Sequence, residues 1–342
     1  MSIKIKIFQF ITPMVAALLL GSYGCSKKNE AEPISFDVTT TKVNGTSTSA
    51  FGRQDTVIFK FSGNPDMITF YSGEVGKRYE YISRTNATGT PQLQFSSLRA
   101  NGSQAGSLSL LISTDFKGAK AGLVNGVFTR DTAGTNANIA AATWTDITGR
   151  ATLSTGAAAA VSSGTINLSE FSKGQPVFLA FKYTAAPGSI QNKWTITNFA
   201  ITNVLSDNTS YTIANLNGPA SAISNYGVNT FGPGWAVSFD PAKNTNNIGW
   251  VYTDKTSLVI TGAATAAAAT AGVEAWAITG PIDLTRVTPD AGTSIKNITA
   301  KLPSYQYNYA APGKYNAVFV AVNATSDESR SLNRTASLTV NP

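Results

Sequence analysis

Apolar and polar residues alternate along most of the chain after residue 35. The stretches that show this alternation best are 36–40, 56–62, 78–82, 175–183, 193–201 and 315–323. Successive side chains of a β-strand point to opposite faces, so a period of two predicts strands with one apolar face. Turn residues such as those of Gly63-Asn64-Pro65-Asp66 separate the stretches. The pattern predicts an all-β protein made of β-sandwiches, with no amphipathic helix.

The N-terminal residues have a different pattern. Lys4 and Lys6 precede an apolar run over 7–20, and Gly24 stands directly before Cys25, the single cysteine of the chain. A basic start, an apolar middle and a small residue are the layout of a secretory signal.

A cysteine directly after the small residue is typical of a bacterial lipoprotein. The signal peptide, residues 1–24, would be removed, and Cys25 would carry the lipid that holds the protein on a membrane. The alternative is an ordinary secretory signal followed by an incidental cysteine. We therefore expect a polar tether over 25–34 and a lipid anchor in the outer membrane, on its periplasmic or its outer face.

The composition is that of an extracellular β-protein and excludes several function classes. Charged residues make up 13% of the chain, and the net charge of +7 is dispersed rather than clustered. Nucleic-acid binding usually requires a clustered basic surface, so we expect no nucleic-acid partner. The chain contains no histidine, and lipidation would consume its one thiol. This removes histidine-based triads, histidine metal sites and cysteine nucleophiles.

A glycosidase would still be possible without histidine, because its chemistry needs two carboxylates that face each other. The candidates are Glu74, Glu80, Glu170 and Glu274, and nothing in the sequence pairs them. We therefore predict that the protein is not an enzyme.

Two sets of segments resemble known domain types. Residues 61–66, 68–74 and 79–81, together with 307–315, resemble the two halves of an immunoglobulin-like domain of the PKD type. A second set resembles the jelly-roll modules of the choice-of-anchor and cleaved-adhesin families, and it comprises 110–118, 142–145, 163–168, 177–183, 194–196 and 274–284.

The order of these resemblances along the chain implies a domain plan. The jelly roll, 91–285, would be inserted into an immunoglobulin-like sandwich built from 35–90 and 286–342. The alternative is two or three modules in series. As a whole, the chain after residue 24 resembles a family of Bacteroidota lipoproteins classed as a domain of unknown function. That resemblance implies a place in the cell envelope and assigns no activity.

A sugar-binding surface needs exposed aromatic rings beside hydrogen-bonding side chains. Trp235, Trp250 and Tyr252 lie in Gly- and Asn-rich sequence, with Asn247 close by, and are the candidates for such a surface. The alternative is that these tryptophans pack in the core, which is the commoner place for them.

The remaining aromatic residues fall inside patterned strands. We expect Trp144, Trp194 and Trp276 to belong to the core. Tyr305, Tyr307 and Tyr309 share one strand face, either as an exposed aromatic ledge or, as we favour, as packing.

Two further kinds of site are weaker candidates. Asp115, Asp131 and Asp146 could supply oxygen ligands to a structural Ca²⁺, although the chain has no dense Asp-x-Asp-x-Asp loop. Thr132 and Thr56 each follow an aspartate and precede a small or aliphatic residue, a pattern used for O-glycosylation. Apart from Ca²⁺, we expect no cofactor.

Together these features predict a non-enzymatic protein of the outer membrane or cell surface. Its expected role is to bind a glycan or another ligand for nutrient uptake, alongside outer-membrane proteins of glycan uptake. The alternative is a structural or adhesive module that contacts protein partners.

Overall fold

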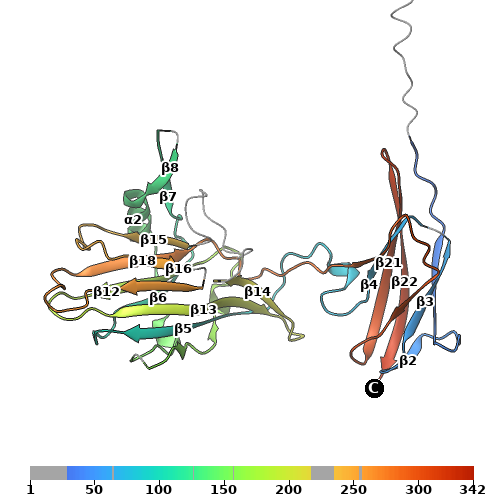
Figure 1. The fold of residues 1–342 in the computed structure, drawn as a ribbon, viewed down its shortest axis with the longest axis horizontal. Helices are drawn as coiled ribbons and strands as arrows, with labels where there is room; N and C mark the ends of the chain where they lie inside the picture. Colours follow the sequence, from blue (N-terminus) through green and yellow to red (C-terminus); the bar gives the residue numbers. More distant parts are fainter. Residues whose placement is uncertain (1–28, 64, 126, 157, 217–234, 254–255) are drawn as a thin grey trace, which may run out of the picture. The chain divides into compact units, whose positions relative to one another are not determined.

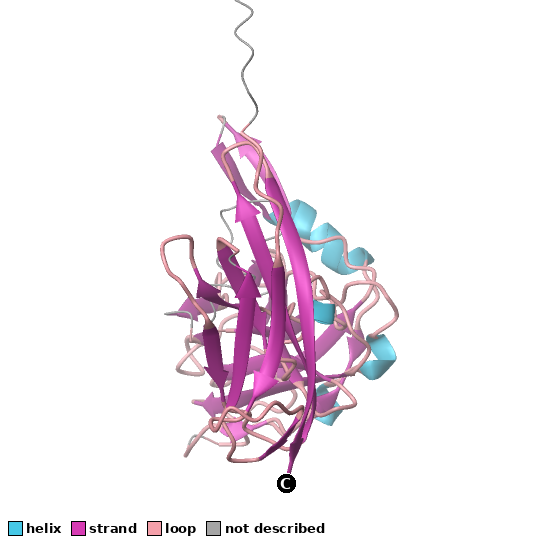
Figure 2. Cartoon of the chain, turned by 90° about the vertical axis from the view of Figure 1, so that its right-hand side faces the viewer, coloured by secondary structure: helices cyan, strands magenta, loops and turns pink. Residues whose placement is uncertain are grey.

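The computed structural model describes residues 29–342 except 64, 126, 157, 217–234 and 254–255 (Figure 1). Its contacts divide the chain into two compact units. The first unit combines Met1–Ile82 with Asp290–Pro342, and the second is Ser83–Pro289. Strands dominate both units, which confirms the predicted all-β class (Figure 2).

The first unit contains two sheets. The three-stranded sheet has the order β1-β3-β20 and the five-stranded sheet the order β19-β4-β21-β22-β2. The strands are β1 (Phe36–Thr41), β2 (Ala50–Gly52), β3 (Val57–Gly63), β4 (Met67–Tyr71), β19 (Thr293–Lys296), β20 (Ser304–Tyr307), β21 (Gly313–Ala324) and β22 (Ser329–Asn341). All pairs are antiparallel except β2 with β22.

Segments from both ends of the chain build this unit. Strand β21 pairs with β4, and Phe319 stands opposite Phe70 in their register. The rings of Phe59, Phe70 and Phe319 form the centre of the core, with centroids 4.9–5.6 Å apart. The chain therefore leaves this sandwich after Ile82 and returns to complete it.

The three tyrosines of residues 305–309 pack on the first unit rather than forming an exposed ledge. Tyr305 and Tyr307 set their rings edge-on against Phe70, with centroids 5.1 and 5.0 Å away. Tyr309 is buried, and its hydroxyl donates to the carbonyl oxygen of Ser72 at 3.0 Å.

Residues 78–82, expected to form a strand, instead include the 3₁₀ helix η1 (Tyr79–Tyr81). The Arg78 backbone N–H donates to the carboxylate of Asp290 at 2.9 Å, and the Arg78 guanidinium lies 4.5 Å from the Tyr81 ring centroid. The Asp290 carboxylate therefore pairs with a backbone N–H that a strand would have paired along a ladder.

The second unit also contains two large antiparallel sheets. One has the order β10-β5-β13-β17-β16, with β11 also on β5 and β14 also on β13. Its strands are β5 (Thr90–Ala100), β10 (Val161–Ser162), β11 (Ile166–Asn167), β13 (Lys193–Val204), β14 (Ser210–Asn215), β16 (Val251–Thr253) and β17 (Ser257–Thr261).

The other sheet, which we call the pocket sheet, has the order β15-β18-β12-β6-β9. Its strands are β6 (Leu108–Ser113), β9 (Thr145–Asp146), β12 (Phe178–Ala185), β15 (Trp235–Phe239) and β18 (Val273–Thr279). The two sheets pack face to face around a buried apolar core with Phe181 at its centre, whose ring lies 5.1 Å from that of Phe95.

Smaller elements complete the second unit. A hairpin of β7 (Lys120–Val124) and β8 (Val127–Asp131) leads into the helix α2 (Thr132–Ala141), and the short helices η2 (Thr148–Arg150) and η3 (Ser169–Phe171) follow.

The helix α2 was not predicted from the sequence, which indicated no amphipathic helix, and α2 itself is barely amphipathic. Asp131 caps it, because its carboxylate accepts the backbone N–H of Gly134 at 2.8 Å. Four of the ten residues of the helix are alanine, the best helix former, and Ile139 is buried against the pocket sheet. The apolar pattern is too weak to predict this helix from sequence, and packing supplies the rest of its stability.

Candidate functional site

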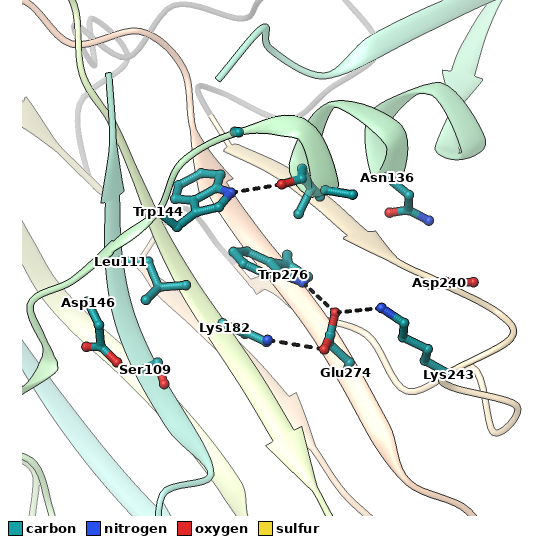
Figure 3. A pocket seen from close by; sticks show the side chains of 13 residues that line it. Ser109, Leu111, Asn136, Trp144, Asp146, Lys182, Asp240, Lys243, Glu274 and Trp276 are labelled. Carbon is teal, nitrogen blue, oxygen red and sulfur yellow. Dashed lines mark hydrogen bonds and ion pairs between the residues drawn. The ribbon is translucent and has the colours of Figure 1, made fainter. Parts of the chain in front are cut away.

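A pocket of about 490 Å³ opens on the outer face of the pocket sheet, the face turned away from the main core. Side chains from β6, β12 and β18 form its floor (Figure 3). The helix α2, the segment 142–146 and the turn that carries Asp240 and Lys243 form its sides.

The alternation of the strands decides which side chains reach this pocket. On β12, Phe181 points into the main core and Lys182 into the pocket. On β18, Ala275 and Ala277 face the main core, whereas Glu274 and Trp276 line the pocket. The register places Ser238, Trp276, Lys182 and Ser109 in one row across four strands.

Two tryptophans form the aromatic side of the pocket. The ring centroids of Trp144 and Trp276 lie 5.3 Å apart, with the ring planes tilted by 47°. The Trp144 indole N–H donates to the carbonyl oxygen of Ile139 at 3.1 Å, which fixes the ring under α2 (Figure 3). Trp276 is 7% exposed and Trp144 is half-buried. Trp144 is therefore the ring that a bound molecule can reach more easily.

A carboxylate held by two lysines occupies the floor beside these rings. The Glu274 carboxylate lies 3.1 Å from the Lys182 ammonium and 3.7 Å from that of Lys243, and it accepts the Trp276 indole N–H at 3.3 Å. The Lys182 ammonium also lies 5.1 Å from the Trp276 ring centroid. Burial opposes ionisation of Glu274, but these hydrogen bonds and the two positive charges outweigh it and lower its pKa.

Polar contacts hold the walls of the pocket in place. Asn136 on α2 donates to the carbonyl oxygen of Phe239 at 3.0 Å and accepts the hydroxyl of Ser238 at 2.7 Å. Asp146 and Asp240 each accept one backbone N–H of their own turn, at 2.8 and 3.0 Å. Rings, ammonium groups and carboxylates thus surround one hollow, a combination suited to a polyhydroxylated molecule.

The residues proposed as a sugar surface lie elsewhere. Trp235 and Trp250 are each 3% exposed and belong to the main core. The Trp250 indole N–H donates to the carbonyl oxygen of Ala275 at 3.3 Å. Burial therefore corrects the expectation that these rings are exposed, because the apparent loops around them continue into the strands β15 and β16.

Tyr252 and Asn247 do not complete such a surface either. The Tyr252 hydroxyl donates to the carbonyl oxygen of Leu216 at 2.6 Å, and burial raises the pKa of this phenol. Asn247 is exposed and has a φ of +53°. It lies in a turn that the buried side chain of Asn244 closes by hydrogen bonds to the backbone N–H and carbonyl oxygen of Ile248. These residues serve the local structure.

The three aspartates proposed for Ca²⁺ each have a separate structural contact. Asp115 accepts the Ser113 hydroxyl at 2.8 Å, Asp131 caps α2, and Asp146 caps the turn before η2. Within the part of the chain that the structure describes, no three His, Cys, Asp or Glu side chains gather as metal ligands.

The proposed modification sites differ in accessibility. Thr132 is exposed at the first position of α2, whereas Thr56 is half-buried just before β3. The proposed lipid site Cys25 lies outside the described residues. No helix among those residues has the length and apolar character needed to cross a bilayer.

Of the three tryptophans expected in the core, Trp194 and Trp276 are buried, at 4% and 7% exposure, and Trp276 also borders the pocket. Trp144 is only half-buried and lines the pocket. The signal that separates the two sides of β18 was present in the sequence. In the alternation of β18, Trp276 shares one face of the strand with the charged Glu274, whereas Ala275 and Ala277 lie on the opposite face. A strand with charge on one face exposes part of that face to water.

A family model described as a domain of unknown function, DUF5017, matches residues 24–221. No curated protein and no solved structure matches the chain significantly. Because the model covers more than half of the chain, the chain belongs to the DUF5017 family. Of the pocket residues, Ser109, Trp144 and Lys182 lie inside the matched range, and Glu274 and Trp276 lie beyond it.

Proposed function

We propose that this DUF5017 protein is a non-enzymatic lipoprotein of the outer membrane or cell surface that binds a glycan for nutrient uptake. The observation that carries the glycan part is the pocket in which Trp144 and Trp276 stand beside the Lys182–Glu274–Lys243 group. Sugar rings present apolar C–H faces and many hydroxyl groups, and such a pocket offers partners for both.

The charges of the pocket favour an uncharged glycan. Both lysines are engaged by Glu274, and the other ionisable groups that line the pocket are Asp146 and Asp240. A ligand carboxylate or sulfate would have to compete with Glu274 for an ammonium group and would meet two more negative charges. We therefore expect neutral polysaccharides to bind better than uronic-acid or sulfated ones.

Affinity gel electrophoresis tests the glycan proposal. The chain without residues 1–24 is run through gels that contain neutral polysaccharides (xylan, β-glucan, mannan, dextran) or acidic ones (alginate, pectin). A neutral polysaccharide should retard the wild type, and Trp144→Ala should strongly reduce the retardation. Ile190→Ala is the matched control, because Ile190 is an exposed apolar residue of the same unit, 42% accessible and outside the pocket. If no polysaccharide retards the wild type, the glycan proposal is wrong.

The lipoprotein part of the proposal is supported by the N-terminal pattern alone, from Lys4 to Cys25. Growth with a labelled fatty acid should label the wild type and send it to the membrane fraction. Cys25→Ala should remove both the label and the membrane association. Protease treatment of intact cells then distinguishes the outer face from the periplasmic face.

The domain types belong to this proposal as well. We assign the first unit to the PKD-type immunoglobulin-like class and the second to the jelly-roll class of Bacteroidota envelope proteins. The support is the pairing of β4 with β21 in the first unit and the two facing antiparallel sheets of the second.

One observation favours the alternative, a structural or adhesive module. Strand β22 presents a row of exposed small polar side chains, comprising Ser329, Ser331, Asn333, Thr335 and Ser337. Such a row offers many hydrogen-bonding groups to a protein partner. Capture of a specific envelope protein by the wild type, lost on changing Asn333 and Thr335 to lysine, would favour this alternative.

A further inference from the structure

We propose that the ligand is a chain of sugar units that crosses the edge strand β9 and occupies two adjacent hollows. This inference rests on the proposed glycan-binding function and specifies the class of ligand. The first hollow is the pocket beside Trp144. The second measures about 230 Å³ and is lined among others by Thr114, Thr143, Thr145 and Lys173.

The two hollows share the same strands. In the segment 142–146, the side chains of Ala142, Trp144 and Asp146 line the pocket, and those of Thr143 and Thr145 line the second hollow. This is the alternation of an extended chain. Strand β6 repeats it, because Leu111 lines the pocket and the next residue, Ile112, lines the second hollow. One thin segment of backbone therefore separates the two hollows.

Because β9 lies at the edge of the pocket sheet, a ligand can pass from one hollow to the other over the segment 142–146. Strand β9 is the last strand of the pocket sheet and pairs with β6 through Leu111 and Ile112. Among the described strands none pairs with its other side. A ligand can lie over an edge strand and use its outward backbone groups, whereas a central strand offers no such groups.

The second hollow has the same kind of chemistry as the first. Phe171 contributes a half-buried ring, and the threonines contribute hydroxyl groups. Glu170 is paired with the Arg150 guanidinium at 2.7 Å, as Glu274 is paired with Lys182 in the pocket. Lys173 and Gln175 are exposed and add hydrogen-bond donors.

A ligand that reaches both hollows gains affinity because its second contact is intramolecular. Once one part is bound in the pocket, the linked sugar units are held at a high effective concentration near the second hollow. Affinity should therefore rise with chain length and then level off when both hollows are filled. A single sugar unit fills one hollow and gains nothing from the other.

Titration calorimetry with a ladder of oligosaccharides tests this proposal. The ladder, from monosaccharide to hexasaccharide, is prepared from the polysaccharide that retards the wild type in gels. The double variant Lys173→Ala/Gln175→Ala should weaken binding of the longest oligosaccharides by about tenfold, the effect of losing one to two hydrogen bonds. It should leave the shortest binding species unchanged, whereas Trp144→Ala should weaken all lengths. Lys117→Ala, at an exposed position outside both hollows, is the matched control.

Hydrogen exchange of the wild type gives a second measurement that needs no variant. The longest oligosaccharide should slow exchange in both 142–146 and 169–175, and the shortest binding species in 142–146 alone. An affinity that is independent of length, or no protection of 169–175, overturns the two-hollow proposal and leaves glycan binding in place. Absence of binding at every length, including the parent polysaccharide, overturns both.

Discussion

The two faces of the pocket sheet are built from the same strands and have opposite characters. The inner face carries Phe181, Ala275 and Ala277 and is closed against the second sheet of its unit. The outer face carries Lys182, Glu274 and Trp276, and α2 covers only part of it. Successive side chains of a strand point to opposite faces, so residues that are neighbours in the sequence have different environments.

This difference shows how a sandwich acquires a binding site without changing its core. The inner face must be closed, because an open core would lose apolar burial. The outer face has its own small apolar cluster under α2, formed around Phe116, Ile139 and Trp276. Where this cover ends, the polar part of the same face remains as a pocket. Substitutions on the two faces should therefore separate stability from binding.

The largest expected effect is on the inner face. Phe181→Ala removes a ring that is 1% exposed and that packs against Phe95, Phe199, Trp235 and Trp250. We expect a loss of about 3–5 kcal/mol in the free energy of unfolding. Denaturant unfolding followed by tryptophan fluorescence measures it, since the five tryptophans all lie in Ser83–Pro289. Phe181→Leu should lose less than half as much, and a loss below 1 kcal/mol for the alanine variant would contradict the closed core.

The next effect is on the outer face. Trp144→Ala should cost about 1–2 kcal/mol of stability, because the ring is half-buried, and should weaken glycan binding by about tenfold or more. Trp144→Phe keeps an aromatic face and should recover part of the affinity. Calorimetric titration with the retained polysaccharide checks both variants. If Trp144→Ala changed stability as much as Phe181→Ala and left affinity intact, the two faces would not have separate roles.

The alternation of apolar and polar residues predicts much of the fold. The strands around 175–183, 193–201 and 315–323 are present, because a period of two is a local property that burial of one face then reinforces. The segment 78–82 has the same alternation and forms a short helix instead. Its groups are satisfied by Asp290, more than 200 residues away in the sequence, which no local pattern reveals.

The site was less predictable than the fold. Alternation indicates that Trp276 and Ala275 lie on opposite faces, but it does not indicate which face meets the second sheet. The helix α2 decides how far the outer face is covered, and its ten residues carry almost no amphipathic signal. The rings of Trp235 and Trp250 were misplaced for the converse reason, because Gly- and Asn-rich flanks conceal the strands that bury them.

A smaller effect is expected at the charged centre of the outer face. Glu274→Gln keeps the shape of the side chain and removes the charge that holds Lys182 and Lys243. We expect a loss of about 1 kcal/mol at neutral pH, since the ion pair is only partly buried. Lys182 and Lys243 would then no longer be paired with a carboxylate. Acidic polysaccharides such as alginate should therefore bind better to this variant than to the wild type.

The pH dependence of this effect follows from the lowered pKa of Glu274. A carboxyl group whose pKa is lower in the folded state contributes its stability above the unfolded pKa, ordinarily 4.5 for Glu. The contribution is lost as the pH falls through the folded value. The difference in unfolding free energy between wild type and Glu274→Gln should therefore shrink as the pH is lowered below about 4.5. A difference that stays constant across this range would show that the charge of Glu274 does not stabilise the fold.

The smallest effect is expected at the hydrogen bond between the outer face of the pocket sheet and the helix α2, which covers part of that face. Ser238→Ala removes the hydroxyl that donates to Asn136 on α2 at 2.7 Å, and should cost about 0.5 kcal/mol, the lower end for a single hydrogen bond. Hydrogen exchange in Thr132–Ala141 should become faster, whereas exchange in β12 should not change. Ser109→Ala, in the same row of the sheet but away from α2, is the control and should leave exchange in the helix unchanged. Equal exchange rates in α2 for wild type and Ser238→Ala would mean that the Ser238 hydroxyl does not hold the helix, and that the bond from Asn136 to Phe239 and the packing of Ile139 are sufficient.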